Sequence, residues 1–131
     1  MSETPMPEKV GELTLAVIVT LGLNMQPGQE ILLGETNISH MKARHPEDYA
    51  CYGSFLPLIL ASPDYVGVNA KDASIEYVKE FREQDEFVKV AVRVSFSGYL
   101  FARSLYVLNK RKIKGFIRNG TLKKPLTNLT E

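Results

Sequence analysis

The sequence has little of what a disulfide scaffold or a zinc site needs. Cys51 is its single cysteine, and it contains neither a CxxC motif nor a Cys/His cluster. One cysteine cannot form an intramolecular disulfide, and the common zinc sites need several such ligands. Any zinc ligands beyond the two histidines would come from scattered carboxylates or this cysteine, so we predict no metal and no other cofactor.

Long hydrophobic runs are also missing. No apolar stretch approaches the roughly 20 residues that a membrane-spanning helix requires. The N-terminal segment MSETPMPEKV has no basic region followed by an apolar one, as a signal peptide would have. We therefore expect a soluble protein without a membrane partner, located in the cytoplasm of the producing or the target cell.

The N-terminal residues differ in character from the rest of the chain. Residues 1–9 are polar and twice interrupted by proline, which predicts a flexible arm. Residues 10–131 have the length of one ordinary domain, and the hydrophobic content of the whole chain, 44%, is enough to bury a core. The sequence therefore predicts a single domain after a short arm.

Acidic residues are scarce at the C-terminal end. From Arg103 onwards the chain has eight basic residues and one acidic residue, whereas residues 1–102 hold eight basic and fourteen acidic ones. This asymmetry indicates a polyanion or an acidic protein as partner. The alternative is an ordinary solvated helix face.

Several segments show helical signals. Residues 12–24 contain a β-branched run typical of a strand, but Thr14 as N-cap and Gly22 as C-terminal residue favour a helix. A helix over 35–45 must stop near His45, because the residue before Pro46 is disfavoured in the α region. A second helix is expected over 46–62, split or ended by Pro57. A third, basic helix is expected from Asn109 to Gly120.

Strand signals occupy 30–34, 66–69, 74–81, 86–96 and 99–108. Helices followed by an antiparallel meander of at least three to four strands and a closing basic helix are typical of an α+β fold. We therefore predict the α+β class.

Three motifs then appear in order along the chain. They are HMKARHP at His40–Pro46, SPDY at Ser62–Tyr65 and RSLY at Arg103–Tyr106. From about residue 10 to residue 124, the chain resembles the phage- and mobile-element-borne barnase/EndoU/colicin/RelE-like (BECR) nuclease domains that recur as toxin modules. The resemblance implies N-terminal helices packed on a twisted antiparallel sheet, and metal-independent endoribonuclease activity of toxin or effector type.

Two other functions remain open. The first is an RNA- or protein-binding module that has kept the fold without turnover. The second is a nuclease-like scaffold recognised by an acidic immunity or antitoxin partner. Both predict the same fold as the enzyme, and aromatic residues near the sheet would stack bases in a binder as well as in an enzyme.

The two histidines are candidates for acid–base chemistry. Metal-independent RNA cleavage needs a base for the 2′-hydroxyl proton and an acid for the leaving 5′-oxygen, and imidazole suits both roles near neutral pH. Five residues apart on one helix, His40 and His45 would point about 140° from each other. His40 is the better catalytic candidate if the helix continues through this segment. His45 is the better candidate if the helix is broken at Pro46 and its end lines the cleft. The alternative is purely structural roles, with His45 as an N-cap and His40 as a packing residue.

The strand over 99–108 provides the next candidates. Strict alternation places Ser104, Tyr106 and Ala102 on one face, and Arg103, Phe101 and Leu105 on the other. By resemblance, Ser104 contacts the phosphate, and Tyr106 is an acid or a stacking group. Arg103 is a substrate-binding candidate only if a bulge turns it toward the same face. An ordinary mixed strand is the alternative.

The remaining candidates are substrate-binding residues. Lys89 and Arg93 share one face of the neighbouring strand and would supply positive charge to a cleft, or form a solvated sheet face. Asn69 would lie at the cleft edge, or act as a turn residue. Lys110, Lys112 and Lys114 would steer RNA toward the cleft.

Overall fold

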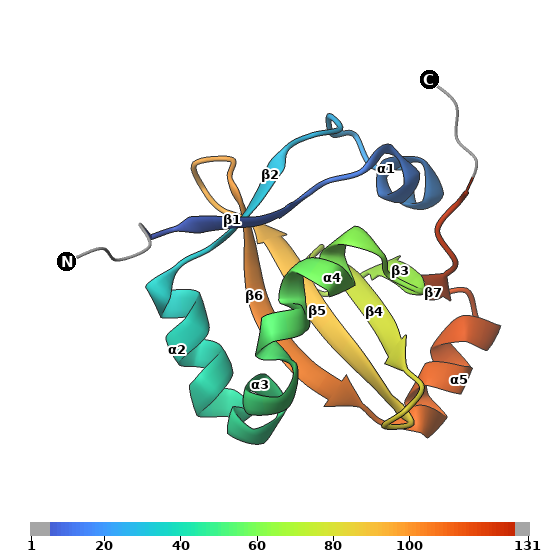
Figure 1. The fold of residues 1–131 in the computed structure, drawn as a ribbon. Helices are drawn as coiled ribbons and strands as arrows, with labels where there is room; N and C mark the ends of the chain where they lie inside the picture. The colour runs from blue at the N-terminus through green and yellow to red at the C-terminus, as the bar shows by residue number, and fades with distance from the viewer. Residues whose placement is uncertain (1–5, 128–131) are drawn as a thin grey trace.

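Seven strands form one sheet in the computed structural model, which describes residues 6–127 (Figure 1). Every neighbouring pair is antiparallel except β2 and β6, which run parallel. In spatial order the strands are β1 (Glu8–Glu12), β2 (Glu30–Leu33), β6 (Leu100–Leu108), β5 (Glu86–Val94), β4 (Ile75–Phe81), β3 (Tyr65–Val68) and β7 (Leu122–Lys123).

Helices cover one face of this sheet and flank its ends. The helical elements are α1 (Leu15–Leu21), α2 (Glu35–Arg44), α3 (Pro46–Tyr52), the 3-10 turn η1 (Gly53–Phe55), α4 (Leu56–Ala61) and α5 (Lys110–Arg118). In Figure 1, α3 and α4 lie in front of the central strands, while α2 and α5 stand on opposite sides of them. The chain is therefore α+β, as predicted.

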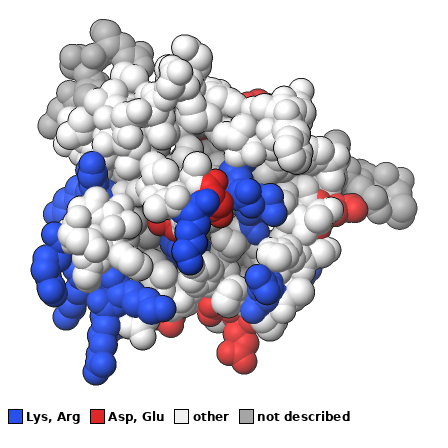
Figure 2. Space-filling view, turned by 180° about the vertical axis from the view of Figure 1, so that it is seen from behind, with Lys and Arg blue, Asp and Glu red and all other residues white. Residues whose placement is uncertain are grey.

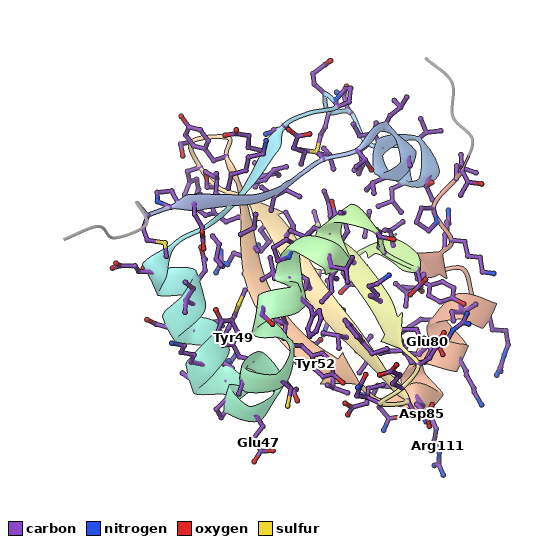
Figure 3. The ribbon with its side chains drawn as sticks, viewed as in Figure 1. Glu47, Tyr49, Tyr52, Glu80, Asp85 and Arg111 are labelled. Carbon is purple, nitrogen blue, oxygen red and sulfur yellow. The ribbon has the colours of Figure 1, made fainter. Side chains whose placement is uncertain are left out.

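The core lies between α3, α4 and the sheet. Apolar residues alternate along β5, so that Val88, Val90 and Val92 are fully buried and pack with Ile59 and Leu60 of α4. Tyr52 joins this layer: in Figure 3 it points from α3 toward the sheet, whereas Glu47 and Arg111 point away from the molecule. One face of the sheet is thus covered by α3 and α4, whereas on the other face Ile113 of α5 packs with Val78 and Leu108 in a second, smaller cluster and leaves the rest of that face uncovered.

The helix predicted over 12–24 is confirmed as α1. The Thr14 hydroxyl accepts a hydrogen bond from Val17 N at 3.3 Å, and Gly22 ends the helix in the left-handed region at φ +65°. The two caps therefore outweigh the strand propensity of the β-branched run between them.

The helix expected over 46–62 is broken earlier than predicted. It gives way to η1 at Gly53–Phe55, and α4 starts at Leu56 with Pro57 in its first turn. Proline is compatible with a first helical turn, where its missing N–H has no partner to lose. Pro57 therefore starts the second helical piece instead of ending the first.

The first strand was not predicted. Glu8–Glu12 form β1, paired with β2 through a register shift between Lys9 and Gly11. Residues 1–5 of the expected arm lie outside the described residues, whereas Glu8 and Lys9 are part of the sheet. The irregular pairing does not follow strict alternation, so this short polar segment gave no recognisable strand pattern.

Candidate active site

The candidate site lies on the sheet face that α3 and α4 leave uncovered, which we call the open face. Directly opposed residues of β5 and β6 point to the same side. The pairs on this side are Lys89 with Tyr106, Ala91 with Ser104, and Arg93 with Phe101. The prediction that Lys89 and Arg93 share a face, and that Ser104 and Tyr106 share a face, is therefore confirmed.

A β-bulge in β6 changes the alternation at Arg103. The register passes from Ala91 opposite Ser104 to Val92 opposite Ala102, which leaves Arg103 as an extra residue. The predicted faces of Ala102 and Phe101 are wrong for this reason, since Ala102 is fully buried in the core. Arg103 is exposed and lines a pocket together with Arg93 and Phe101. The bulge thus turns Arg103 toward the open face.

His45 stacks on Tyr106 at the edge of this face. The ring centroids are 4.8 Å apart and the ring planes are inclined by 23°. His45 is the junction residue between α2 and α3, with φ −142° and ψ 68°, because Pro46 starts the new helix. The broken helix end therefore brings the imidazole to the phenol ring.

Asp48 fixes this junction to the sheet. Its Oδ2 accepts a hydrogen bond from Val107 N of β6 at 3.0 Å and lies 4.0 Å from His45 Nδ1. Asp48 was not among the predicted site residues. Asp48 therefore ties the junction that carries His45 to β6 and leaves a carboxylate beside the imidazole.

His40 is placed differently. It is exposed in α2, and within residues 6–127 no hydrogen bond, ion pair or ring contact joins it to the other predicted site residues. At a spacing of four residues it shares a stripe of α2 with Thr36 and Arg44. Of the two histidines, the structure brings only His45 to Tyr106.

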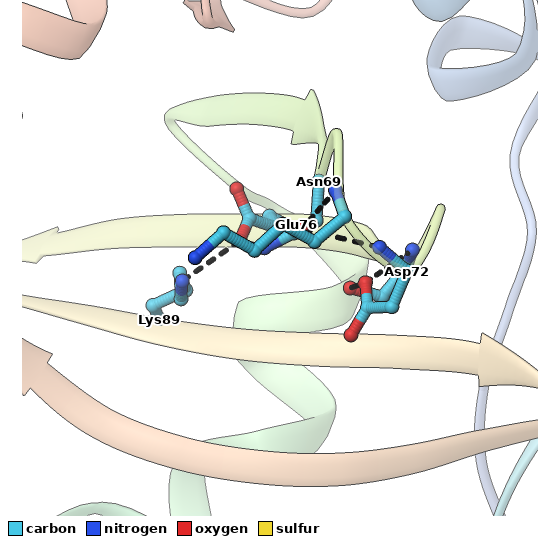
Figure 4. A network of polar contacts seen from close by, with 6 residues as sticks. Asn69, Asp72, Glu76 and Lys89 are labelled. Atoms are coloured by element: carbon cyan, nitrogen blue, oxygen red, sulfur yellow. Dashed lines mark hydrogen bonds and ion pairs between the residues drawn. The ribbon is translucent and has the colours of Figure 1, made fainter.

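Lys89 belongs to a half-enclosed polar network (Figure 4). Its Nζ lies 2.7 Å from Glu76 Oε2, and the two side chains are only 13% and 9% exposed. Asn69 Nδ2 donates to the same carboxylate oxygen at 3.3 Å, and Lys89 Nζ lies 5.0 Å from the centre of the Tyr106 ring. A lysine charge is thus held directly beside the predicted catalytic tyrosine.

The pKa of Lys89 reflects opposing influences. Burial lowers this pKa, but the Glu76 carboxylate and the Tyr106 hydroxyl raise it more, so that the pKa lies above the ordinary lysine value. The ammonium group therefore stays charged despite its low exposure.

Asn69 has two roles in the turn between β3 and β4. Its Oδ1 accepts from Lys71 N at 2.8 Å, as in an Asx turn, while its Nδ2 holds Glu76. Hydrogen bonds from Ser74, together with the charge of Arg93, lower the pKa of the Asp72 carboxyl in the same turn. Asn69, Glu76 and Lys89 line a hollow of about 540 Å³ between this turn and α5.

The basic helix α5 borders the open face. Ile113, Phe116 and Ile117 pack onto the sheet, and Asn109 Oδ1 caps the helix by accepting from Arg111 N at 2.8 Å. Lys112 and Lys114 are exposed, whereas Lys110 pairs with Asp85. Figure 2, seen from behind, shows lysine and arginine side chains gathered on the side where α5 lies.

Glu76 was not predicted as a site residue. It lies between Ile75 and Tyr77 in a strand, and an acid flanked by buried residues was the only signal in the sequence. Its lysine partner is thirteen residues away, on the next strand. Only the strand register brings the two together.

Among residues 6–127, no group of three or more His, Cys, Asp and Glu side chains is arranged to hold a metal ion. None of the helices in the same range combines the length and the apolar character needed to cross a membrane.

Comparison with protein families gives a match over most of the chain. A family model described as phage-Barnase-EndoU-ColicinE5/D-RelE like nuclease 3 matches residues 8–115. The matched range contains every predicted site residue, from His40 to Lys114. No curated protein and no solved structure matches the chain.

Proposed function

The chain belongs to this family of phage-borne BECR-like nucleases, and on that premise we propose that it is a metal-independent endoribonuclease of toxin or effector type. RNA is the proposed substrate because it carries its own nucleophile, the 2′-hydroxyl. The protein then has to supply proton transfer and charge stabilisation, both of which amino-acid side chains provide without a cofactor.

The observation that carries this proposal is the His45–Tyr106 stack beside Lys89. It combines an imidazole ring, a phenol hydroxyl and a lysine charge on the sheet face opposite α3 and α4. Ser104 lies on the same face of β6, two positions before Tyr106, which separates their Cα atoms by about 6.5 Å. A phosphodiester on this face would meet all of these groups.

In the proposed reaction, one group of the His45–Tyr106 pair removes the proton from the 2′-hydroxyl. The 2′-oxygen attacks phosphorus, and the bond from phosphorus to the 5′-oxygen breaks. The other group protonates this leaving oxygen, so that the products end in a 2′,3′-cyclic phosphate and a 5′-hydroxyl. Asp48 holds the helix junction against β6 and so keeps the imidazole of His45 beside Tyr106.

Lys89 and Ser104 act on the phosphate. The transition state carries more negative charge on the non-bridging oxygens than the substrate does, so a fixed ammonium and a hydroxyl donor stabilise it preferentially. Ser104 does not attack the substrate, because the 2′-hydroxyl already occupies that role. No covalent adduct on Ser104 is expected.

The function is tested by incubating the purified protein with total RNA in excess EDTA and identifying the product ends. Fragments ending in 2′,3′-cyclic phosphate are expected, and 2′-O-methylated RNA should remain intact. Binding of RNA without fragments would identify a binding module of the same fold. Cleavage that requires an added divalent cation would contradict the metal-independent mechanism.

A further inference from the structure

A second hollow opens on the same face, beyond the bulge in β6. It has a volume of about 430 Å³ and lies between the start of α2, the end of β5 and the start of β6. Arg93, Arg103 and Phe101 contribute its charged and aromatic lining. It shares no lining residue with the hollow at Lys89.

The two arginines are available to a ligand. Neither forms an ion pair or a side-chain hydrogen bond within residues 6–127, although other basic residues there, such as Lys89 and Lys110, are paired. Glu35 is the acidic residue of the lining, and Asp72 lies near enough for Arg93 to lower its pKa. An anion between the two guanidinium groups would be bound by charge-assisted hydrogen bonds.

Aromatic surface accompanies this charge. Phe101 is half-buried in the lining, and the adjoining β5–β6 turn presents Phe96 and Tyr99, which are 114% and 59% exposed. Guanidinium groups beside aromatic faces are the combination that binds single-stranded nucleic acid, with the phosphate on the cations and the base stacked on the ring.

The hollow lies at a defined distance from the acid–base pair. The first turn of α2 lines it, and His45 follows the last turn of the same helix. Nine residues of helix from Thr36 to His45 span about 14 Å at 1.5 Å per residue. This corresponds to about four stacked nucleotides at roughly 3.4 Å each, and to fewer in an extended strand.

From these observations we infer that the hollow at Arg93, Arg103 and Phe101 is a nucleotide subsite for single-stranded RNA, separated by several nucleotides from the phosphodiester at His45. The inference rests on the proposed function and narrows it. The substrate is a single strand long enough to reach both places, with α2 as the wall along which it runs.

The test measures the affinity of 2′-O-methylated oligonucleotides of three and of eight nucleotides, which lack the 2′-hydroxyl nucleophile. For the wild-type protein, the dissociation constant for eight nucleotides should be about 10- to 100-fold lower than that for three. This gain in affinity is what one stacked and charge-bound nucleotide contributes. Arg93→Gln/Arg103→Gln should remove most of this gain and change the affinity for three nucleotides less than about threefold. Phe101→Leu, which keeps an apolar side chain, should remove part of it.

The control Lys79→Gln/Arg82→Gln removes two positive charges from β4 and the turn that follows it, away from α2 and the hollow, and should preserve the dependence on length. The inference is wrong if the wild type binds both lengths equally, or if the arginine variant keeps the full gain. RNA cleavage, assayed in parallel, keeps the two proposals apart. If RNA is cleaved but the affinity does not depend on oligonucleotide length, only the proposed subsite is contradicted. If the affinity depends on length through the two arginines but RNA is not cleaved, only the proposed enzymatic activity is contradicted.

Discussion

The imidazole of His45 and the phenol ring of Tyr106 are stacked with their centroids 4.8 Å apart, although the two residues come from a helix junction and a strand. The stack holds the imidazole at the edge of the open face, where Asp48 Oδ2 lies 4.0 Å from its Nδ1. An acid–base group is useful only in a fixed geometry, and here the ring is restricted by packing against Tyr106 and by the hydrogen bond that joins Asp48 of the same junction to Val107 N of β6.

Substitution of Tyr106 separates stacking from proton transfer. Tyr106→Phe keeps the ring and removes the hydroxyl, so single-turnover cleavage should fall by roughly 100-fold or more if the hydroxyl is an acid or base. Tyr106→Leu also loses the stack and should be slower still. Cleavage by Tyr106→Phe at the wild-type rate would restrict Tyr106 to positioning His45.

The Lys89–Glu76 pair should be strongly coupled in stability. Removing either partner leaves a poorly exposed charge without its counterion, so Lys89→Met and Glu76→Gln should each lower the free energy of unfolding by about 3 kcal/mol at pH 7. The double variant should lose less than the sum. Urea denaturation of all four proteins measures the coupling, and the exposed pair Lys9–Glu12 is a matched control that should show far less.

The sign of the pH dependence follows from the raised pKa of Lys89. The stabilisation is complete below the unfolded lysine pKa of about 10.4 and is lost as the pH rises through the folded pKa. On the alkaline side, the coupling should therefore be large at pH 7 and decline only in strongly alkaline solution. A coupling energy that vanished near neutral pH would contradict the raised pKa of Lys89 in the folded protein.

Tyr77 carries a buried hydroxyl without a hydrogen-bond partner among the described residues, and its side chain is fully buried. An unsatisfied buried hydroxyl costs roughly 1–3 kcal/mol. Tyr77→Phe should therefore raise the free energy of unfolding by about 1 kcal/mol, measured by urea denaturation at pH 7. A loss of stability would indicate that the hydroxyl is bonded in solution.

Burial also raises the pKa of Tyr77, which favours the protonated phenol in the folded state. This contribution is complete below the unfolded pKa near 10 and is lost as the pH rises from there through the folded pKa. The stability of Tyr77→Phe should decline less steeply than that of the wild type above pH 10.

The exposed lysines of α5 should steer RNA without entering the chemical step. Phosphate contacts release counterions, so log Kd should depend on log salt with a slope of about 0.7 per neutralised phosphate of a single strand. Lys112→Gln/Lys114→Gln should flatten this slope and leave single-turnover cleavage at saturating RNA near the wild-type rate. Lys110→Gln should have a smaller effect, because Lys110 already pairs with Asp85. An unchanged slope in the double variant would mean that this surface binds something other than RNA.

Local signals in the sequence predict much of this fold. The caps Thr14, Gly22 and Asn109 define helices α1 and α5, and apolar alternation predicts the meander of β4, β5 and β6. The strand β1 and the bulge at Arg103 escape prediction, because both depend on how one strand pairs with a neighbour. Pairing is a non-local property that single-sequence periodicity does not contain.

The candidate site likewise combines features that the sequence predicts with features that only the tertiary structure shows. Spacing along the chain identified Lys89 with Arg93 and Ser104 with Tyr106 as residues of common faces. It left open whether His40 or His45 faces the sheet, since this depends on where α2 meets β6. Glu76 and Asp48 act through partners thirteen and fifty-nine positions away, and only the tertiary structure brings these groups together.

The central claim is that His45, at the broken end of α2, performs acid–base chemistry in RNA cleavage. Its most direct test compares single-turnover cleavage of one RNA by His45→Ala and His40→Ala in EDTA, with product ends identified. We predict a loss of about 100- to 10,000-fold for His45→Ala and a rate within a few-fold of wild type for His40→Ala, with 2′,3′-cyclic ends throughout. Full activity of His45→Ala, or the reverse order of the two variants, would contradict the claim and move the chemistry to the Thr36–His40–Arg44 stripe of α2 or away from the histidines altogether.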